Sequence, residues 1–556
     1  MKHYLNRTNT LNEPVLTRRR FVTGFAAGGA VFGLGLGSCL AQTSKHTLSR
    51  PLPLSTSPQT LKGNRFDLNI AYQLANFTGK DRVATSVNGS LPAPTLRWRE
   101  GDRVKINLKN NLAQDSSIHW HGIILPTQMD GVPGLSFNGI KPGKSFEYEF
   151  EVNQSGTYWY HSHSGFQEQT GVYGAIVIDP KEPDPVAYDR DYVVMLSDWS
   201  DESPENIYAK LKKLSHYYNF RERTVVNIWQ DIKEQGVLNT WNKRAMWNEM
   251  RMSETDISDV TGYTYTFLMN GITPDKGWTA LFKTGEKVRL RFINGAAMSI
   301  FDIRIPGLKM TVVAADGQNI ESVTVDEFRI GVAETYDVIV EPQGDSAFTI
   351  FAQTIDRSGF ARGTLTADKS LQAEVPEMDP APILAHRDMG MGSECLPEHA
   401  AMGHCKLEGI VKSKVENNPV CLPEHAAMGH CLMDESPILQ GGAGNALITH
   451  PATEYGPHVD MRTEKPQSGL KDPGIGLRDH HYLYGRRVLN YSDIRNLYPT
   501  LDRREPSREI ELHLTGNMSR YMWSMNGIKF ADAKPLALNY GERVRITLVN
   551  DTMMTQ

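Results

Sequence analysis

A ten-residue pattern that occurs three times limits the folds open to this chain of 556 residues. Each copy begins with a Gly-acid-basic turn, continues with alternating apolar and polar residues and ends in Asn; the copies span residues 101–110, 285–294 and 541–550. An Asn-Gly pair precedes every copy at a similar distance. Such alternation is typical of a β-strand with one buried face. Three copies therefore predict three repeats of one β-sandwich unit in an all-β protein.

The repeats divide the chain into consecutive parts. We predict a signal segment (1–41), a first sandwich (48–180), a second sandwich (190–367), a linker (370–475) and a third sandwich (477–556). Residues 201–260 are more polar and helical in pattern, and we expect them to form an insertion in the second sandwich. Because only six residues follow the third copy, we expect the third part to hold the N-terminal half of a sandwich.

Two short histidine pairs in the first sandwich predict a metal site. They are His119-Trp-His121 and His161-Ser-His163, each beside aromatic strand residues. Side chains two apart in a strand point to the same face, so two such pairs on neighbouring strands would gather four imidazoles in one small volume. Nitrogen donors of this kind suit copper or zinc. The stretch after the second copy holds no histidine, and we expect no copper ligand in the second sandwich.

The linker contains a duplication, because residues 395–405 recur as residues 421–431. Thioether, imidazole and thiolate groups are donors that Cu(I) selects, which favours a copper-collecting linker. The candidate donors are His386, Met389, Met391, Cys395, His399, Met402, His404, Cys405, Cys421, His425, Met428, His430 and Cys431. A disordered linker duplicated by slippage is the alternative, and its four cysteines could pair as two disulfides, for example Cys395–Cys405 and Cys421–Cys431.

The N-terminus predicts export. Arg18 and Arg19 form a twin-arginine core, and an uncharged, glycine-rich stretch follows at 21–44. This pattern indicates a twin-arginine signal cleaved after Ala41 and a periplasmic destination. The alternatives are a transmembrane anchor and a lipid anchor at Cys39. The net charge of -5 and the lack of a long basic run elsewhere argue against nucleic acid as a partner.

Further motifs resemble one enzyme family. Besides the histidine pairs and Met129-Asp130-Gly131, the matching stretches are residues 194–201, 305–317, 487–491 and 521–527. Together they resemble the multicopper oxidases, which include laccases and ascorbate oxidase, and more closely the periplasmic copper-resistance oxidases. The resemblance implies three cupredoxin-like Greek-key β-sandwich domains in tandem, the third incomplete.

The resemblance also implies a reaction and residue roles. One-electron oxidations of Cu(I) or a phenolic donor at a type 1 copper would feed a three-copper cluster that reduces O₂ to water. His119 would ligate the type 2 copper, and His121, His161 and His163 the type 3 pair. Asp130 would supply protons, a general-acid role. The alternative for Asp130 is a turn residue before Gly131.

The sequence departs from the family in its last part. The family supplies the type 1 ligands and four further cluster histidines from His-Pro-x-His-x-His-Gly and His-Cys-His motifs, but no cysteine follows Cys431 here. We therefore predict that the chain as written is inactive as an oxidase. A copper-sequestering protein without turnover is the alternative function. A zinc hydrolase with four histidine ligands and Asp130 as its base is a third interpretation.

Overall fold

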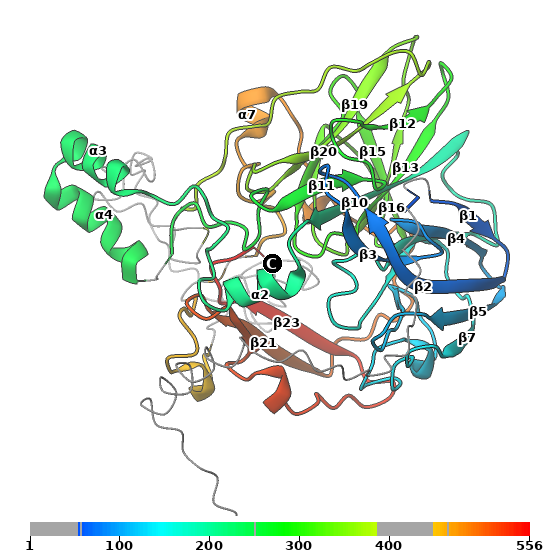
Figure 1. Ribbon diagram of the computed structural model, residues 1–556, viewed down its shortest axis with the longest axis horizontal. Coiled ribbons are helices and arrows are strands. Elements are labelled where there is room, and N and C mark those ends of the chain that lie inside the picture. The colour runs from blue at the N-terminus through cyan, green and yellow to red at the C-terminus, as the bar shows by residue number, and fades with distance from the viewer. Residues whose placement is uncertain are drawn as a thin grey trace, which may run out of the picture. The chain divides into compact units, whose positions relative to one another are not determined.

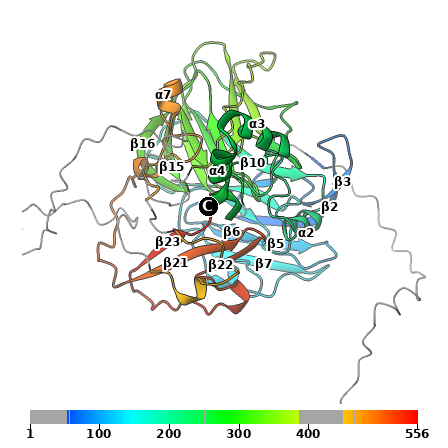
Figure 2. The ribbon, with the colours of Figure 1, turned by 90° about the vertical axis from the view of Figure 1, so that its left-hand side faces the viewer.

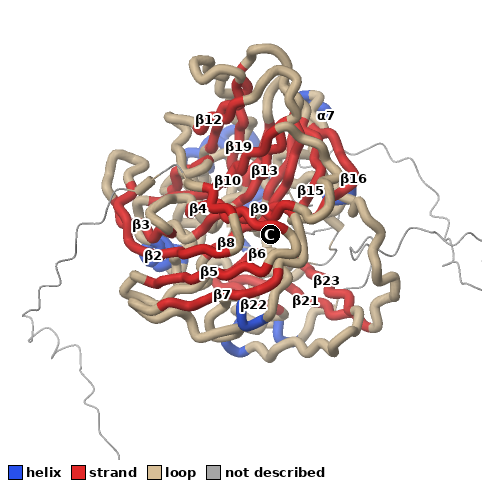
Figure 3. The backbone as a smooth tube through the Cα atoms, turned by 90° about the vertical axis from the view of Figure 1, so that its right-hand side faces the viewer, coloured by secondary structure: helices blue, strands red, loops and turns tan. Residues whose placement is uncertain are grey.

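The computed structural model describes residues 54–55, 58–249, 252–385, 388, 449–463, 466 and 468–555. Strands make up most of the regular structure in this part of the chain, and the helices are short (Figure 3). The all-β prediction is confirmed. The predicted signal segment and every predicted linker ligand lie outside the described residues. Among the described residues, no helix has the length and apolar character needed to cross a membrane.

The first sandwich consists of a four-stranded sheet, ordered β3-β2-β5-β7, and a five-stranded sheet, ordered β1-β4-β9-β8-β6. Its core lies between the sheets, where Trp98, Trp120 and Phe150 pack against one another. The elements are β1 Thr60–Lys62, β2 Arg65–Ala75, β3 Arg82–Val87, β4 Ala93–Arg99, β5 Arg103–Asn110, β6 His119–His121, η1 Thr127–Met129, β7 Ser145–Glu151, β8 Gly156–His161 and β9 Tyr173–Asp179.

The second sandwich consists of a six-stranded sheet, ordered β11-β10-β13-β18-β15-β16, and a five-stranded sheet, ordered β12-β20-β19-β14-β17. Its strands are β10 Arg190–Ser200, β11 Tyr265–Met269, β12 Trp278–Leu281, β13 Val288–Asn294, β14 Phe301–Arg304, β15 Met310–Ala315, β16 Gln318–Val325, β17 Glu327–Ile330, β18 Thr335–Val340, β19 Ala347–Thr354 and β20 Phe360–Thr366. The expected insertion is helical: α2 Pro204–Leu211, α3 Val225–Gln235 and α4 Val237–Glu249, of which α3 and α4 lie away from the sheets (Figure 1).

A third sheet has the order β22-β21-β23 (Figure 2). Two apolar side chains of β23, Ile546 and Leu548, are exposed. The elements of this part are η3 Ala452–Glu454, α7 His480–Tyr484, η4 Tyr491–Asp493, β21 Arg508–Asn517, β22 Met522–Met525, η5 Phe530–Asp532 and β23 Val544–Asn550. The domain boundaries expected from the sequence stay predictions.

The three sequence copies form the same local structure. Their strands β5, β13 and β23 each pair in parallel with the first long strand of their unit, β2, β10 and β21. The Asn that ends each copy accepts a hydrogen bond from the backbone N–H two residues later, at distances of 2.9, 3.1 and 2.9 Å for Asn110, Asn294 and Asn550. Its amide donates to a carbonyl four or five residues ahead. The repeat therefore encodes a strand and the turn that ends it.

Candidate metal centre

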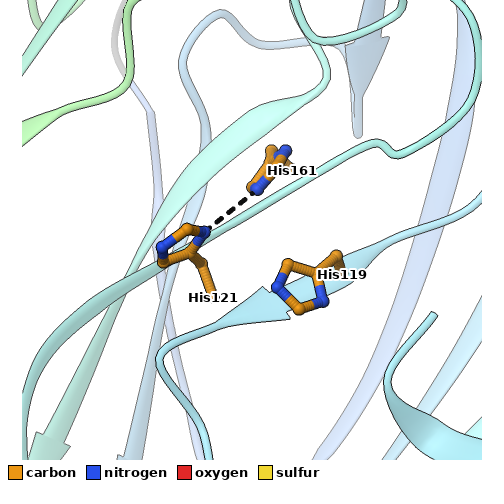
Figure 4. A group of neighbouring side chains, drawn as sticks. All are labelled: His119, His121 and His161. Atoms are coloured by element: carbon orange, nitrogen blue, oxygen red, sulfur yellow. Dashed lines mark hydrogen bonds between the residues drawn. The ribbon is translucent and has the colours of Figure 1, made fainter. Parts of the chain in front are cut away.

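His119 and His121 lie on β6, and His161 lies on the adjacent antiparallel strand β8. His119 pairs with His161 and His121 with Trp159, in the register of β6 and β8. Side chains alternate along a strand, so the rings of His119, His121 and His161 lie on one face of the sheet together with Trp159. Trp120 lies on the other face and packs in the core. Figure 4 shows His119, His121 and His161 turned toward one another.

The nitrogen atoms of three histidines converge. One ligand atom from each of His119, His121 and His161 lies within 4.8 Å of the others. His121 Nδ1 is 3.3 Å from His161 Nε2. Two nitrogens bound to one metal at about 2.0–2.1 Å and at a tetrahedral angle would be about 3.3 Å apart, so this pair fits a shared metal ion.

His163 lies at the edge of the group. It follows β8, and its ring centroid is 5.0 Å from that of His119 and 5.2 Å from that of His161. Its backbone N–H donates to Ser117 Oγ at 3.1 Å. The structure thus brings all four predicted histidines together, with three ligand atoms closest to one another.

Hydrogen bonds hold two of the rings from behind. His119 Nδ1 donates to the backbone carbonyl of Asp130 at 2.8 Å. His161 Nδ1 lies 3.2 Å from the carbonyl oxygen of Ser162 and 3.1 Å from a carboxylate oxygen of Glu168. With the hydrogen on Nδ1, Nε2 keeps its lone pair for a metal, which is the usual arrangement behind ligating histidines. Sequence reasoning missed Glu168, because nothing in its local sequence marks it.

The local electrostatics favour neutral imidazoles. Burial, with the neighbouring His161, His119 and His163, lowers the pKa of His121 to about 4. Burial and neighbouring histidines also lower the pKa of His163. A neutral imidazole is the form that binds a metal, and the lowered pKa values of His121 and His163 favour that form at neutral pH.

Trp159 forms the base of the group. Its ring stacks on His161 with centroids 4.2 Å apart and planes at 15°, and it also stacks on His121 at 5.1 Å. The side chain is buried. Its contact with two candidate ligands was not expected from the sequence, since only the strand pairing reveals it.

Asp130 contacts the group mainly through its backbone. Its carboxylate Oδ1 is 3.3 Å from His119 Nδ1, and its side chain is partly exposed. The next residue, Gly131, has φ +75°, and a Cβ there would lie 1.7 Å from the carbonyl oxygen of Ile118. A glycine is therefore required for the close approach that places Asp130 against His119.

A cavity of about 300 Å³ lies beside His121, between the two sandwiches. Tyr158, Trp159, Asp316 and Glu334 are among its lining residues. Burial raises the pKa of both Asp316 and Glu334. The second sandwich thus places two carboxyl groups, Asp316 and Glu334, in the cavity beside His121.

The structure also gathers two groups that the sequence did not predict. One consists of His450, Glu454, His513 and Asp551, and the other of Glu327, Asp379 and His480. Each group joins segments that are far apart in the sequence, so no local motif could have indicated the whole of either group.

Comparison with known proteins identifies the class to which this fold and centre belong. Two family models, both described as multicopper oxidase, match residues 69–183 and 190–370. The chain belongs to the multicopper oxidase family, a family of oxidoreductases that use copper.

Within this family, the chain is similar to copper-resistance proteins. The chain is 53% identical to Copper resistance protein A of Escherichia coli over 97% of this chain and 88% of that protein. It is 53% identical to the Copper resistance protein A homolog of Pseudomonas syringae pv. tomato, with the same coverage of each chain. It is 31% identical to Multicopper oxidase MmcO of Mycobacterium tuberculosis over 63% of this chain and 67% of that protein.

Proposed function

We propose that this protein acts in copper resistance as an exported oxidase that removes electrons from Cu(I) or a phenolic donor and reduces O₂ to water. The observation that carries the proposal is the convergence of His119, His121 and His161, with two facing nitrogens 3.3 Å apart. The names of the similar proteins support the copper-resistance role. The twin arginines at Arg18 and Arg19 support export to the periplasm.

The ligand roles follow the motif positions. His119 would hold a type 2 copper, and His121, His161 and His163 would hold the type 3 pair. When bound, copper supplies one-electron chemistry between the donor and O₂. The carbonyl of Asp130 and the carboxylate of Glu168 orient the rings of His119 and His161. The Asp130 carboxyl group, 3.3 Å from His119 Nδ1, would hold and release a proton at the edge of the site.

A polypeptide of these 556 residues alone contains no cysteine after Cys431. We therefore assign no type 1 copper ligands within these 556 residues. For this polypeptide we expect copper binding at the histidine group without the intense blue absorption of a type 1 centre. Copper sequestration without turnover is the second candidate function, and the linker donors at residues 386–431 favour it.

The test combines copper counting with oxygen uptake. The purified chain is loaded with copper, dialysed, and supplied with a Cu(I) complex or a phenol in an oxygen electrode. His161→Asn should lower the bound copper, while His216→Asn should not, because His216 pairs with Glu222 and belongs to no described ligand group.

The outcomes separate the two functions. Oxygen uptake that His161→Asn abolishes supports the oxidase and would contradict the inactivity predicted for these 556 residues alone, whereas bound copper without uptake agrees with that inactivity and supports sequestration. A strong blue band from the 556-residue polypeptide would contradict the expected absence of a type 1 centre. Equal copper content in the His161→Asn variant and the unmodified chain would overturn the assigned ligand role.

A further inference from the structure

A second group of metal-ligating side chains lies at the third sheet. His450 and Glu454 come from the segment that contains η3, His513 from β21, and Asp551 from the residue after β23. One ligand atom from each of the four lies within 4.8 Å of the others. Glu454, His513 and Asp551 are at most 1% exposed, and the His450 side chain is 14% exposed. The group is thus a built interior site.

No lysine or arginine of the described residues pairs with the two carboxylates of this site. Among the described residues, the side-chain ion pairs of Glu454 and Asp551 are all with His450 and His513. Burying a carboxylate without a cationic partner is costly. Two buried carboxylates therefore require positive charge from within the group.

The Nε2 atoms of His450 and His513 face away from the carboxylates, and their hydrogen bonds show which ring nitrogens carry hydrogen. His450 Nε2 is 3.0 Å from the carbonyl oxygen of Thr463, and His513 Nε2 is 2.9 Å from a carboxylate oxygen of Glu511. These oxygens accept hydrogen bonds, so both Nε2 atoms carry hydrogen. In neutral rings the Nδ1 lone pairs then face inward, toward the carboxylates. Hydrogen-bonded outer nitrogens with lone pairs aimed at a common point are the usual support of histidine metal ligands.

The inward-facing atoms lie very close together. His450 Nδ1 is 2.7 Å from Glu454 Oε2, and His513 Nδ1 is 2.7 Å from Asp551 Oδ2. At this distance a hydrogen on Nδ1 would form a hydrogen bond to the carboxylate, whereas the lone pair of a neutral ring would repel that oxygen unless a cation lay beside both. A cation among the four groups would convert both repulsive contacts into attractive ones.

One carboxylate oxygen has no hydrogen-bond partner. Glu454 Oε1 is fully buried and receives no hydrogen bond among the described residues. It lies 3.5 Å from His513 Nδ1, on the inner side of the group. An unsatisfied buried acceptor costs about 1–3 kcal/mol, and more if charged. Glu327 Oε1 is also without a hydrogen-bond partner, but arginine side chains lie beside that group, whereas Glu454 Oε1, in the part of the chain that the structure describes, has only the histidines of its own group nearby.

A superficially similar group shows what a charge-balanced arrangement looks like. Glu327, Asp379 and His480 are also buried and also close together. Arg304 Nη1 lies 2.6 Å from Asp379, and Arg486 Nη1 lies 2.9 Å from the same carboxylate. Two guanidinium groups thus supply the positive charge there, and a metal ion is not needed to balance the carboxylates.

We propose that His450, Glu454, His513 and Asp551 bind one divalent transition-metal ion. Two imidazoles and two carboxylates form a donor set that accepts Zn²⁺ or Cu²⁺. The bound ion ties the 449–463 segment to β21 and β23, and it is separate from the histidine group on β6 and β8. This assignment does not depend on the oxidase proposal.

Zinc is the probe, because it has no redox chemistry. The full chain is stripped with a chelator, dialysed against ZnCl₂, and its zinc content is measured per chain. Glu454→Gln, which keeps the shape but removes the charge, should bind one zinc fewer than the unmodified chain. Glu327→Gln, a matched change in the arginine-balanced group, should leave the zinc count unchanged.

Glu511→Gln tests the outer support of His513. It removes no proposed ligand, and we expect zinc affinity at this site to fall by roughly 10- to 100-fold, as for other residues that orient a ligand. The competing explanation is that both histidines are imidazoliums paired with the carboxylates. In that case Glu454→Gln and Glu511→Gln leave zinc binding unchanged, which overturns the proposal.

If Glu454→Gln does not fold, a second measurement on the unmodified chain tests the site. Crystals of the unmodified chain soaked in ZnCl₂ are measured at the zinc absorption edge. An anomalous peak among the four side chains supports the site. An ordered, metal-free cluster in the same crystals overturns it.

Discussion

At the scale of single residues, Gly131 makes the placement of His119 possible. Its φ of +75° and the 1.7 Å approach of a built Cβ to the Ile118 carbonyl leave no room for a side chain. We expect Gly131→Ala to lower the free energy of unfolding by more than the roughly 1–3 kcal/mol of left-handed strain alone, and to weaken copper binding.

Gly134 provides the control for this prediction. Its φ of +83° is similar, but a Cβ there meets nothing within 4 Å. Gly134→Ala should therefore cost only the backbone strain and leave copper binding intact. Urea unfolding and copper titration of the two variants measure the difference, and equal losses would contradict the steric argument.

Also at the residue scale, His121 should make the copper-free protein sensitive to acid. Its pKa is about 4 in the folded state, against 6.5 for an unperturbed histidine. The unfolded chain therefore binds more protons between these values, and stability falls as the pH drops from about 6.5 to 4. The loss is on the order of 3 kcal/mol if His121 acts alone.

The measurement is urea unfolding of the copper-free protein from pH 4 to pH 8. His121→Gln carries no titrating ring, so its stability should vary less across this range. Curves of equal slope for the variant and the unmodified chain would show that His121 does not carry the effect.

At the scale of elements, a buried ion network connects the strands of the second sandwich. Asp337 on β18 accepts hydrogen bonds from Arg289 at 2.6 Å and Arg291 at 3.0 Å, both on β13. Asp337 is 1% exposed. Removing it leaves two buried guanidinium groups with less counter-charge, and we expect Asp337→Ala to cost about 3–5 kcal/mol in urea unfolding.

The exposed pair Lys141–Asp115 is the comparison for this network. Its side chains are 66% and 45% exposed, at a distance of 2.5 Å. Asp115→Ala should cost less than about 1 kcal/mol, because water screens the pair. A similar cost for both variants would show that the buried network contributes little.

At the scale of the whole molecule, export should depend on the twin arginines. Arg18 and Arg19 lie outside the described residues, so this prediction is based on sequence alone. Because the motif is an address read by a receptor, Lys at both positions should leave the protein in the cytoplasm, while Arg20→Lys should be tolerated. Cell fractionation with immunoblotting measures this, and normal export of the double variant would contradict it.

The two sandwiches also meet at the strand that carries the site. Tyr158 on β8 donates a hydrogen bond to Gly317 O at 3.4 Å, and Arg291 donates to Thr157 Oγ1 at 2.9 Å. A Cβ on Gly317 would lie 2.1 Å from the ring of Tyr158. The second sandwich, expected from the sequence to carry no ligand, thus supports β8 from outside the metal group.

The sequence by itself determined the all-β fold, the repeated strand-and-turn unit and the four histidines of the first sandwich. Each of these depends on local spacing: alternation along a strand, an Asn after it, and two histidines two residues apart. Only the tertiary structure brought Glu168 and Trp159 against those histidines. It also gathered His450, Glu454, His513 and Asp551, because contacts between distant segments form through packing and charge pairing, which no local pattern records.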